Sequence, residues 1–467
     1  MIKNKLIYYL INDSDLENLV LNSSQTNNDQ KTQTNNKGDF NHINNDNVLI
    51  IDTNNIEKLI SKGYISVDKL TNAINKYTIY KQIDNYVELQ WMLKDSLSIN
   101  SENLDIKIVN LSMPNVTLIT KNAFKNCYSL QEIKLPNVTE IKSNAFENCK
   151  SLINIEIPNV TKLDWYVFKN CESLKTIKIP NATQIGWNAF ENCYSLVTIK
   201  LPNLTELSPL TFENCKSLKN IKIPNVNEVG WYAFHNCESL KTIKIPSAIK
   251  IGWNAFENCY SLKTIKMPNV TKIQSYAFYN CNLLTNIKMS RVNKIGISAF
   301  KNCHSLEKIK LPNVTEIGLS AFENCNKLET IKIPNVTNIA QSTFENCYLL
   351  TNMKIPNVIE IDSNAFKNCI FLTNIKIPNV TEIGLSAFEN CQSLKTIKMP
   401  NVFEIESGAF EHCINLTNLE MQNLLYINNN VFPYSKIEYK NSKLPEWLTE
   451  ELFTEIIKGI AISKPKN

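Results

Sequence analysis

Apolar and polar positions recur with a period of 22 residues through most of the chain. Phenylalanine occupies positions 124, 146, 168 and 190, and then every 22nd position as far as Phe432, with no insertion or deletion. A fixed period of about 20 to 50 residues is typical of a solenoid, in which each unit buries its apolar face against its neighbours. We therefore expect residues 105–432 to form a solenoid of about 14 repeats.

Each period predicts two short stretches of extended chain and a turn. Ile155, Glu156 and Ile157 alternate apolar and polar side chains, which predicts a short strand with one buried face. Pro158 ends this strand because its nitrogen cannot donate a ladder hydrogen bond. A second short strand or turn, such as VTEIG at 380–384, completes the coil. The segment NAFENC at 144–149 has no alternation and predicts one helical or 3₁₀ turn, ended by an Asn that tolerates the left-handed conformation.

The repeat resembles a known family. The stretch IPNVTEIGLSAFENCQSLKTIKMP at 377–400 is similar to the repeat of the BspA-like leucine-rich repeat family, and the resemblance covers about residues 105–432. It implies a curved leucine-rich-repeat-like α/β solenoid with short helical or 3₁₀ turns and a parallel sheet on the concave face. It also implies an association with adhesion and protein binding rather than catalysis. A parallel β-helix is the alternative fold, because coils of this length suit it as well.

The two ends of the chain do not share the period. We expect an N-terminal helical segment at 1–21, a linker rich in Asn, Gln, Ser and Thr at 22–48, and a small helical region or N-terminal cap at 49–104. Residues 433–467 predict a C-terminal cap with an amphipathic helix that begins at Pro445. This helix covers the last coil, or alternatively it docks a partner.

Composition adds little to this picture. The chain has 49 basic and 44 acidic residues and a formal net charge of +5, so only the placement of charge can indicate an anionic partner. No window approaches 18 consecutive apolar residues, and the N-terminus lacks the pattern of a signal peptide. The expectation is therefore a cytoplasmic protein with no membrane span. A cell-surface or secreted protein exported by a non-standard route is the alternative.

The regularly spaced cysteines are candidates for disulfides, metal ligands or nucleophiles. All 14 lie three residues after a repeat phenylalanine, from Cys127 to Cys413. Stacked side chains point the same way, and no Cys-x-x-Cys pair suggests a zinc site, so we expect buried apolar thiols rather than disulfides, metal ligands or nucleophiles. The chain also lacks a phosphate-binding glycine loop and a serine-hydrolase motif. We expect no enzyme activity, no catalytic residue, no cofactor and no metal.

The strongest functional signal is the polar residue inside the first predicted strand. It must point outward because buried residues flank it. Thr or Asn occupies most positions two residues earlier, and a column that is mostly Glu follows the phenylalanines on another side. Glu156 and Glu420 interrupt a file of lysines at Lys134, Lys178, Lys200, Lys222, Lys244, Lys266, Lys288, Lys310, Lys332, Lys354, Lys376 and Lys398.

A second candidate surface is aromatic. Trp165, Trp187, Trp231 and Trp253 each lie three residues before a repeat phenylalanine. If these side chains are exposed, they form an aromatic patch suited to binding sugar rings or a protein. The alternative is that they are half-buried.

Three functions remain open from the sequence. The first is a non-catalytic scaffold for protein–protein or adhesin-like interactions. The second is binding of a polyanion or acidic glycan by the lysine file, although the same lysines also suit a role in keeping an exposed sheet soluble. The third is an enzyme or effector in residues 1–100 that the solenoid targets. Nucleic acid is the least expected partner, because the lysine file contains no aromatic residues on which bases stack.

Overall fold

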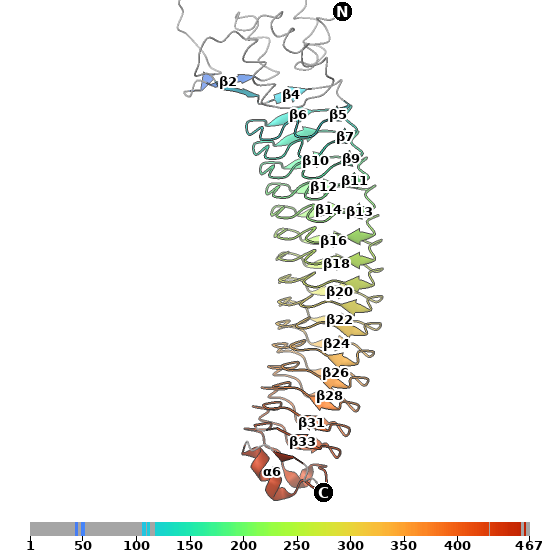
Figure 1. The fold of residues 1–467 in the computed structure, drawn as a ribbon, viewed down its shortest axis with the longest axis vertical. Coiled ribbons are helices and arrows are strands. Elements are labelled where there is room, and N and C mark those ends of the chain that lie inside the picture. Colours follow the sequence, from blue (N-terminus) through green and yellow to red (C-terminus); the bar gives the residue numbers. More distant parts are fainter. Residues whose placement is uncertain are drawn as a thin grey trace, which may run out of the picture. The chain divides into compact units, whose positions relative to one another are not determined.

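The computed structural model describes residues 117–428 and 430–458, together with strand backbone at 43–44, 48–51, 105–108, 110–112 and 462–463 (Figure 1). The chain divides into two compact units. Unit 1 extends to Leu204 and includes Thr211–Ile223, and unit 2 consists of Thr205–Leu210 and Pro224–Asn467.

One 22-residue period forms one coil with two short strands in different sheets. In β18 (Thr264–Lys266) the central Ile265 is buried and its two neighbours are exposed. In β19 (Lys272–Ile273) the first side chain points outward and the second is buried. Side chains alternate across a strand, so the two predicted strands of the repeat are confirmed.

In unit 1 the coils stack into two parallel sheets. The first sheet contains, in spatial order, β4 (Asn110–Ser112), β6 (Glu132–Lys134), β8 (Asn154–Glu156), β10 (Thr176–Lys178), β12 (Thr198–Lys200) and β14 (Asn220–Lys222). The second contains β5 (Leu118–Ile119), β7 (Glu140–Ile141), β9 (Lys162–Leu163) and β11 (Gln184–Ile185).

Unit 2 has the same arrangement. Its first-strand ladders are β16 (Thr242–Lys244), β18, β20 (Asn286–Lys288), β22 (Lys308–Lys310) and β24 (Thr330–Lys332), and then β26 (Asn352–Lys354), β28 (Asn374–Lys376), β30 (Thr396–Lys398) and β32 (Asn418–Glu420). Its second-strand ladders are β13 (Glu206–Leu207), β15 (Glu228–Val229), β17 (Lys250–Ile251), β19, β21 (Lys294–Ile295) and β23 (Glu316–Ile317), and then β25 (Asn338–Ile339), β27 (Glu360–Ile361), β29 (Glu382–Ile383), β31 (Glu404–Ile405), β33 (Tyr426–Ile427) and the antiparallel β34 (Ile462–Ser463).

The repeat phenylalanines form the centre of each core. Phe300 and Phe322 are fully buried, and their ring centroids lie 5.4 Å apart with an angle of 3° between the rings. Similar near-parallel pairs follow one another in both units, for example Phe146 and Phe168 in unit 1 at 5.4 Å. Equivalent side chains therefore stack in files, as the period predicts.

The segment around each phenylalanine is a series of turns rather than a helix. Hydrogen bonds from the amides of Lys125 and Cys127 to the carbonyls three residues earlier close 3₁₀-type turns. Asn122 and Asn126 have φ values of 62° and 65°, and two left-handed residues four positions apart prevent a continuous helix. The predicted left-handed Asn is confirmed, whereas the left-handed residue four positions earlier is an additional finding.

The C-terminal end contains a 3₁₀ helix, η1 (Tyr439–Asn441), and an α-helix, α6 (Glu450–Ile457). Helix α6 begins five residues after the predicted start at Pro445, because Thr449 caps it by accepting a hydrogen bond from the Leu452 amide. Phe453 and Ile456 are buried, and the Trp447 Nε1 donates to the Leu424 carbonyl of the last coil at 2.8 Å. Within the described part of the chain, no helix is long and apolar enough to cross a membrane.

Near the N-terminus, β1 (Ile43–Asn44) pairs antiparallel with β2 (Val48–Ile51), which pairs in parallel with β3 (Asp105–Ile108). Apart from these strand residues, the predicted segments at 1–21, 22–48 and 49–104 lie outside the described residues.

Candidate partner-binding faces

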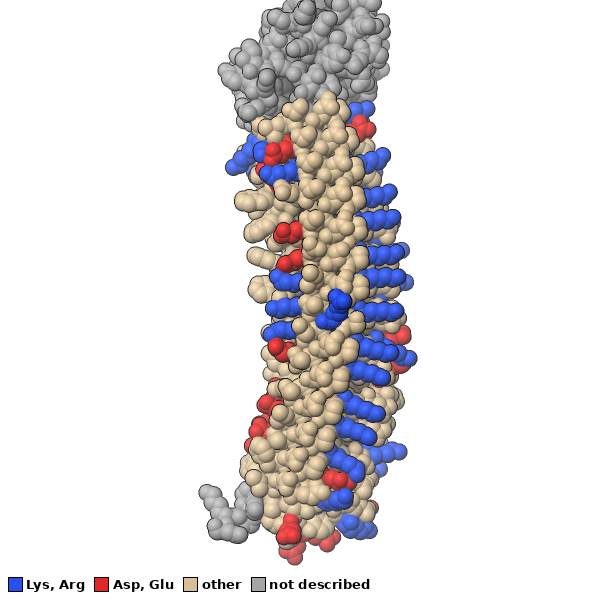
Figure 2. All heavy atoms as spheres, turned by 90° about the vertical axis from the view of Figure 1, so that its right-hand side faces the viewer, with Lys and Arg blue, Asp and Glu red and all other residues tan. Residues whose placement is uncertain are grey.

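The lysine file lies where the sequence predicts, on the exposed side of the first strands. The register pairs Lys200 with Lys222 in unit 1, and Lys244 with Lys266 in unit 2. We call the lysines at the last position of these strands the lysine face. It contains Lys134, Lys178, Lys200 and Lys222 in unit 1, and Lys244, Lys266, Lys288, Lys310, Lys332, Lys354, Lys376 and Lys398 in unit 2. Figure 2 shows basic side chains gathered in a file along one edge of the view.

The lysine face of unit 2 carries almost no compensating charge. Among the described residues, its only ion pair joins the Lys398 Nζ to the Glu420 Oε1 at 2.6 Å, and this hydrogen bond lowers the pKa of Glu420. Adjacent ammonium groups about 5 Å apart repel by about 1 kcal/mol even in bulk water, before salt screening. The face is therefore a surface that an anionic partner would stabilise.

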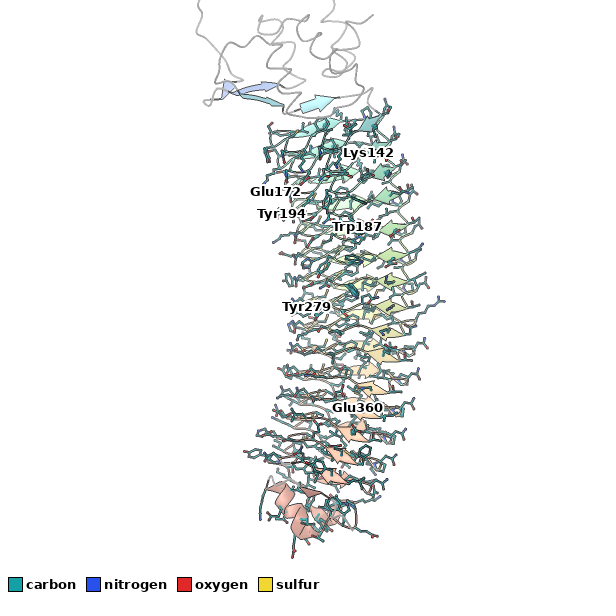
Figure 3. The ribbon with its side chains drawn as sticks, viewed as in Figure 1. Lys142, Glu172, Trp187, Tyr194, Tyr279 and Glu360 are labelled. Atoms are coloured by element: carbon teal, nitrogen blue, oxygen red, sulfur yellow. The ribbon has the colours of Figure 1, made fainter. Side chains whose placement is uncertain are left out.

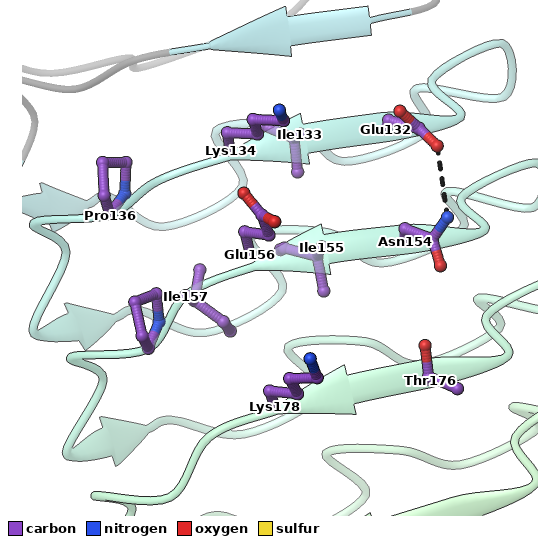
Figure 4. Close-up of a pocket in the computed structure, with 11 residues that line it drawn as sticks. Glu132, Ile133, Lys134, Pro136, Asn154, Ile155, Glu156, Ile157, Thr176 and Lys178 are labelled. Atoms are coloured by element: carbon purple, nitrogen blue, oxygen red, sulfur yellow. Dashed lines mark hydrogen bonds between the residues drawn. The ribbon is translucent and has the colours of Figure 1, made fainter.

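The lysine file is interrupted in unit 1. Glu156 lies in register between Lys134 and Lys178, and the strands here line a hollow of about 600 Å³ (Figure 4). Its lining includes apolar residues such as Ile155, and the Asn154 amide donates a hydrogen bond to the Glu132 carboxylate at 3.1 Å. This part of the face alternates in charge, so it is less suited to a polyanion than the uniform file of unit 2.

The tryptophans lie on a different surface. Each follows the second strand of its coil, and Trp187 is labelled in Figure 3. Their exposed fractions are 59% for Trp165, 46% for Trp187, 45% for Trp231 and 54% for Trp253. They form one tilted pair in unit 1, at 6.2 Å, and another in unit 2, at 6.4 Å. The tryptophans are thus exposed, but the structure does not bring them together with the lysine face.

The cysteines form a buried ladder. All 14 are free and buried, and the Cys325 thiol donates to the Phe300 carbonyl at 3.2 Å. Equivalent bonds link successive coils, as from Cys281 to Phe256 at 3.1 Å. Burial raises the pKa of thiols in this ladder, for example of Cys413 to about 12. The thiols therefore act as small apolar groups that also satisfy a backbone carbonyl.

The column of glutamates that follows the phenylalanines is partly neutralised by lysines of adjacent coils. Four of them pair with a lysine one coil earlier, and Glu323 and Lys301 lie 2.7 Å apart. The other three pairs are Lys125–Glu147, Lys169–Glu191 and Lys367–Glu389. These pairs neutralise much of the column.

The sequence analysis did not single out one further charged file. We call the outward residues of the eight second strands from β17 to β31 in unit 2 the charge column. The 22-residue period alone gives the order of these residues, which is three lysines, then one glutamate and one asparagine, and then three more glutamates. The column contains Lys250, Lys272, Lys294, Glu316, Asn338, Glu360, Glu382 and Glu404.

Comparisons with known proteins agree with this architecture. The BspA type leucine rich repeat region matches residues 101–219, 205–329, 271–380 and 359–452. A leucine-rich repeat protein from Bacteroides ovatus is 27% identical, with a TM-score of 0.55, over 72% of this chain and 92% of that one. A leucine rich cell surface protein from Faecalibacterium prausnitzii is 28% identical, with a TM-score of 0.39, over 66% of this chain and 83% of that one. No curated protein matches the chain. The Bacteroides structure supports a leucine-rich-repeat solenoid over the alternative of a parallel β-helix.

Proposed function

The chain belongs to the BspA-type leucine-rich repeat family, and from this premise we propose that it is a non-catalytic interaction scaffold whose lysine face binds an acidic protein surface. The observation that carries the proposal is the uniform file of eight lysines in unit 2, of which only Lys398 has an acidic partner among the described residues. The strands hold these ammonium groups in register before any partner arrives, so binding orders little of the scaffold.

A second candidate is an acidic glycan. The ammonium groups repeat at the strand spacing of about 4.8 Å, and a linear polyanion that lies along the file would contact many of them at once. The Thr and Asn side chains beside the lysines suit either candidate. Asn374 already donates to Asn352 at 3.1 Å, and such amides offer further hydrogen bonds to peptide or sugar groups.

The test compares two double variants in the same two coils. The variant K244E/K266E reverses the charge of two residues of the lysine face. The variant K241E/K263E reverses the charge of two exposed lysines that precede them by three residues in the sequence and lie outside the file. The probes are labelled poly-L-glutamate and heparin, measured by fluorescence anisotropy at about 50 mM and about 200 mM salt.

We expect K244E/K266E to weaken poly-L-glutamate binding by about tenfold or more, and K241E/K263E by less than about twofold. Higher salt should weaken binding by the wild-type chain. Preference for heparin over poly-L-glutamate would favour the glycan instead. Absence of binding to both probes, or equal losses in the two variants, would show that the lysines only keep the sheet soluble.

A further inference from the structure

The charge column of unit 2 is ordered so that its two halves complement each other. Its basic half consists of Lys250, Lys272 and Lys294, which the ladders hold in register. Its acidic half consists of Glu360, Glu382 and Glu404, also held in register. Glu316 and Asn338 lie between the halves. A rotation of 180° about the centre of the column therefore places the basic half where the acidic half was, and the acidic half where the basic half was.

The acidic half is not neutralised by the part of the chain that the structure describes. Among the described residues, none of its three glutamates has a basic partner, and Glu360, labelled in Figure 3, only accepts a hydrogen bond from Asn338 at 3.1 Å. Burial and the nearby Asp362 and Glu382 raise the pKa of Glu360. In the basic half, Lys250 contacts Glu228 and Lys294 contacts Glu316, whereas Lys272 has no acidic partner among the described residues.

We propose that this face of unit 2 binds a second copy of the same chain in an antiparallel two-fold dimer. The two-fold axis lies between Glu316 and Asn338, so that Lys272 of each copy meets Glu382 of the other. Lys250 then meets Glu404 and Lys294 meets Glu360, and the symmetry repeats every contact twice. This interaction uses a different sheet from the lysine face, so it is independent of the proposed function.

The charges select both the direction and the register of this dimer. A parallel dimer would place every charge against its own copy, and like charges at an interface are repulsive. A shift by one coil in one direction would place Glu316 against Glu360. A shift in the other direction would place Glu228 against Glu404 and Glu316 against itself. Only the proposed register gives three attractive contacts per copy without a like-charge contact in the column.

Neighbouring positions are compatible with the same register. The additional carboxylates of Asp362 and Glu406 fall opposite Gly296 and Gly252 of the second copy, which have no side chains to obstruct them. Exposed apolar side chains flank the column on both sides. Their exposed fractions are 52% for Ile249, 51% for Ile359, 43% for Leu319 and 47% for Leu385.

The size of the face indicates a weak dimer. Eight coils at about 4.8 Å form a strip about 38 Å long, and five residues per coil give a width of about 16 Å. The strip covers about 600 Å² per copy, or about 1,200 Å² in total, which is the lower end of specific interfaces. We therefore expect a dissociation constant in the micromolar range.

The test uses the full-length chain and sedimentation velocity over a range of concentrations. Lys272 and Glu382 are both exposed, so their reversal leaves the core intact, and circular dichroism checks the fold. K272E alone and E382K alone should each weaken dimerisation by about 100-fold, because each reversal creates two repulsive contacts. The matched control is K266E, which changes the same charge in the same coil on the lysine face and should leave the dimer unchanged.

The decisive measurement is the mixture of K272E with E382K. In a mixed dimer, each introduced charge at position 272 or 382 meets the opposite charge on the other copy, so both contacts become attractive again. We expect the mixture to dimerise within about threefold of the wild-type affinity, although neither variant does so alone. The proposal is wrong if the wild-type chain stays monomeric at about 100 μM, if K266E weakens the dimer as much as K272E, or if the mixture does not restore it.

Discussion

At the scale of single residues, two backbone positions in each coil determine the path of the chain. Ser320 and Asn324 have φ values of 53° and 60°, and each coil repeats this spacing. In nearly every coil, the position equivalent to Asn324 is occupied by Asn. The side-chain amides of these residues form a ladder, in which Asn324 Nδ2 donates to Asn302 Oδ1 at 2.7 Å. The position of Ser320 has no such ladder, and it also holds Tyr232, Leu210 and Gly408 in other coils.

This difference predicts that Ser320→Gly stabilises the protein. A side chain at positive φ costs about 1 kcal/mol, and Gly408 shows that the column accepts glycine at a φ of 65°. We expect a gain of about 0.5–1 kcal/mol, measured from urea unfolding midpoints. The control is Ser305→Gly at a position without positive φ, which should be neutral or destabilising. Stabilisation by both variants would contradict the explanation.

The cysteine ladder predicts unreactive thiols. Burial raises the pKa of thiols such as Cys413, so little thiolate exists at pH 8, and burial also excludes the reagent. With Ellman's reagent at pH 8, we expect no thiol to react in the native protein and all 14 to react after denaturation in guanidinium. Rapid reaction of several thiols under native conditions would contradict the buried ladder.

At the scale of elements, the sequence predicts the strands better than the turns. Alternation around Ile265 identifies both the buried side chain and the outward Lys266, because a strand has only two sides. The turns before each strand depend on φ values that the mixed column at Ser320 does not reveal. The start of α6 was also missed, because Pro445 permits a helix start but the cap is formed by Thr449.

The two candidate faces also differ in how far the sequence predicts them. The lysine face was predicted because one residue type fills its column. The charge column was missed because its residues differ from coil to coil, and their order matters only once the ladders place them in register. The uniform lysines of the first strands suit an anionic partner that differs from this chain. The charge column of the second strands has a basic half and an acidic half, and this order suits a second copy of the chain.

At the scale of the whole molecule, each coil makes its principal contacts with its immediate neighbours. Phe322, for example, stacks between Phe300 and Phe344 at 5.4 and 5.6 Å. In such an array, stability is approximately a sum of the contributions of single coils and of the contacts between adjacent coils. Removal of one complete period should therefore leave every remaining coil with an equivalent neighbour.

This argument predicts that the chain tolerates deletion of residues 331–352. The deletion joins Thr330 to Met353, and Met353 takes the buried place of Ile331 in the strand. We expect unchanged circular dichroism per residue and only a small loss of stability in thermal unfolding. Deletion of residues 331–351 is the matched control, because the extra Asn352 puts the strand out of register and exposes an apolar side chain or buries a polar one. This deletion should cost about 1–3 kcal/mol more, and equal tolerance of both deletions would show that the 22-residue period does not determine the register of the coils.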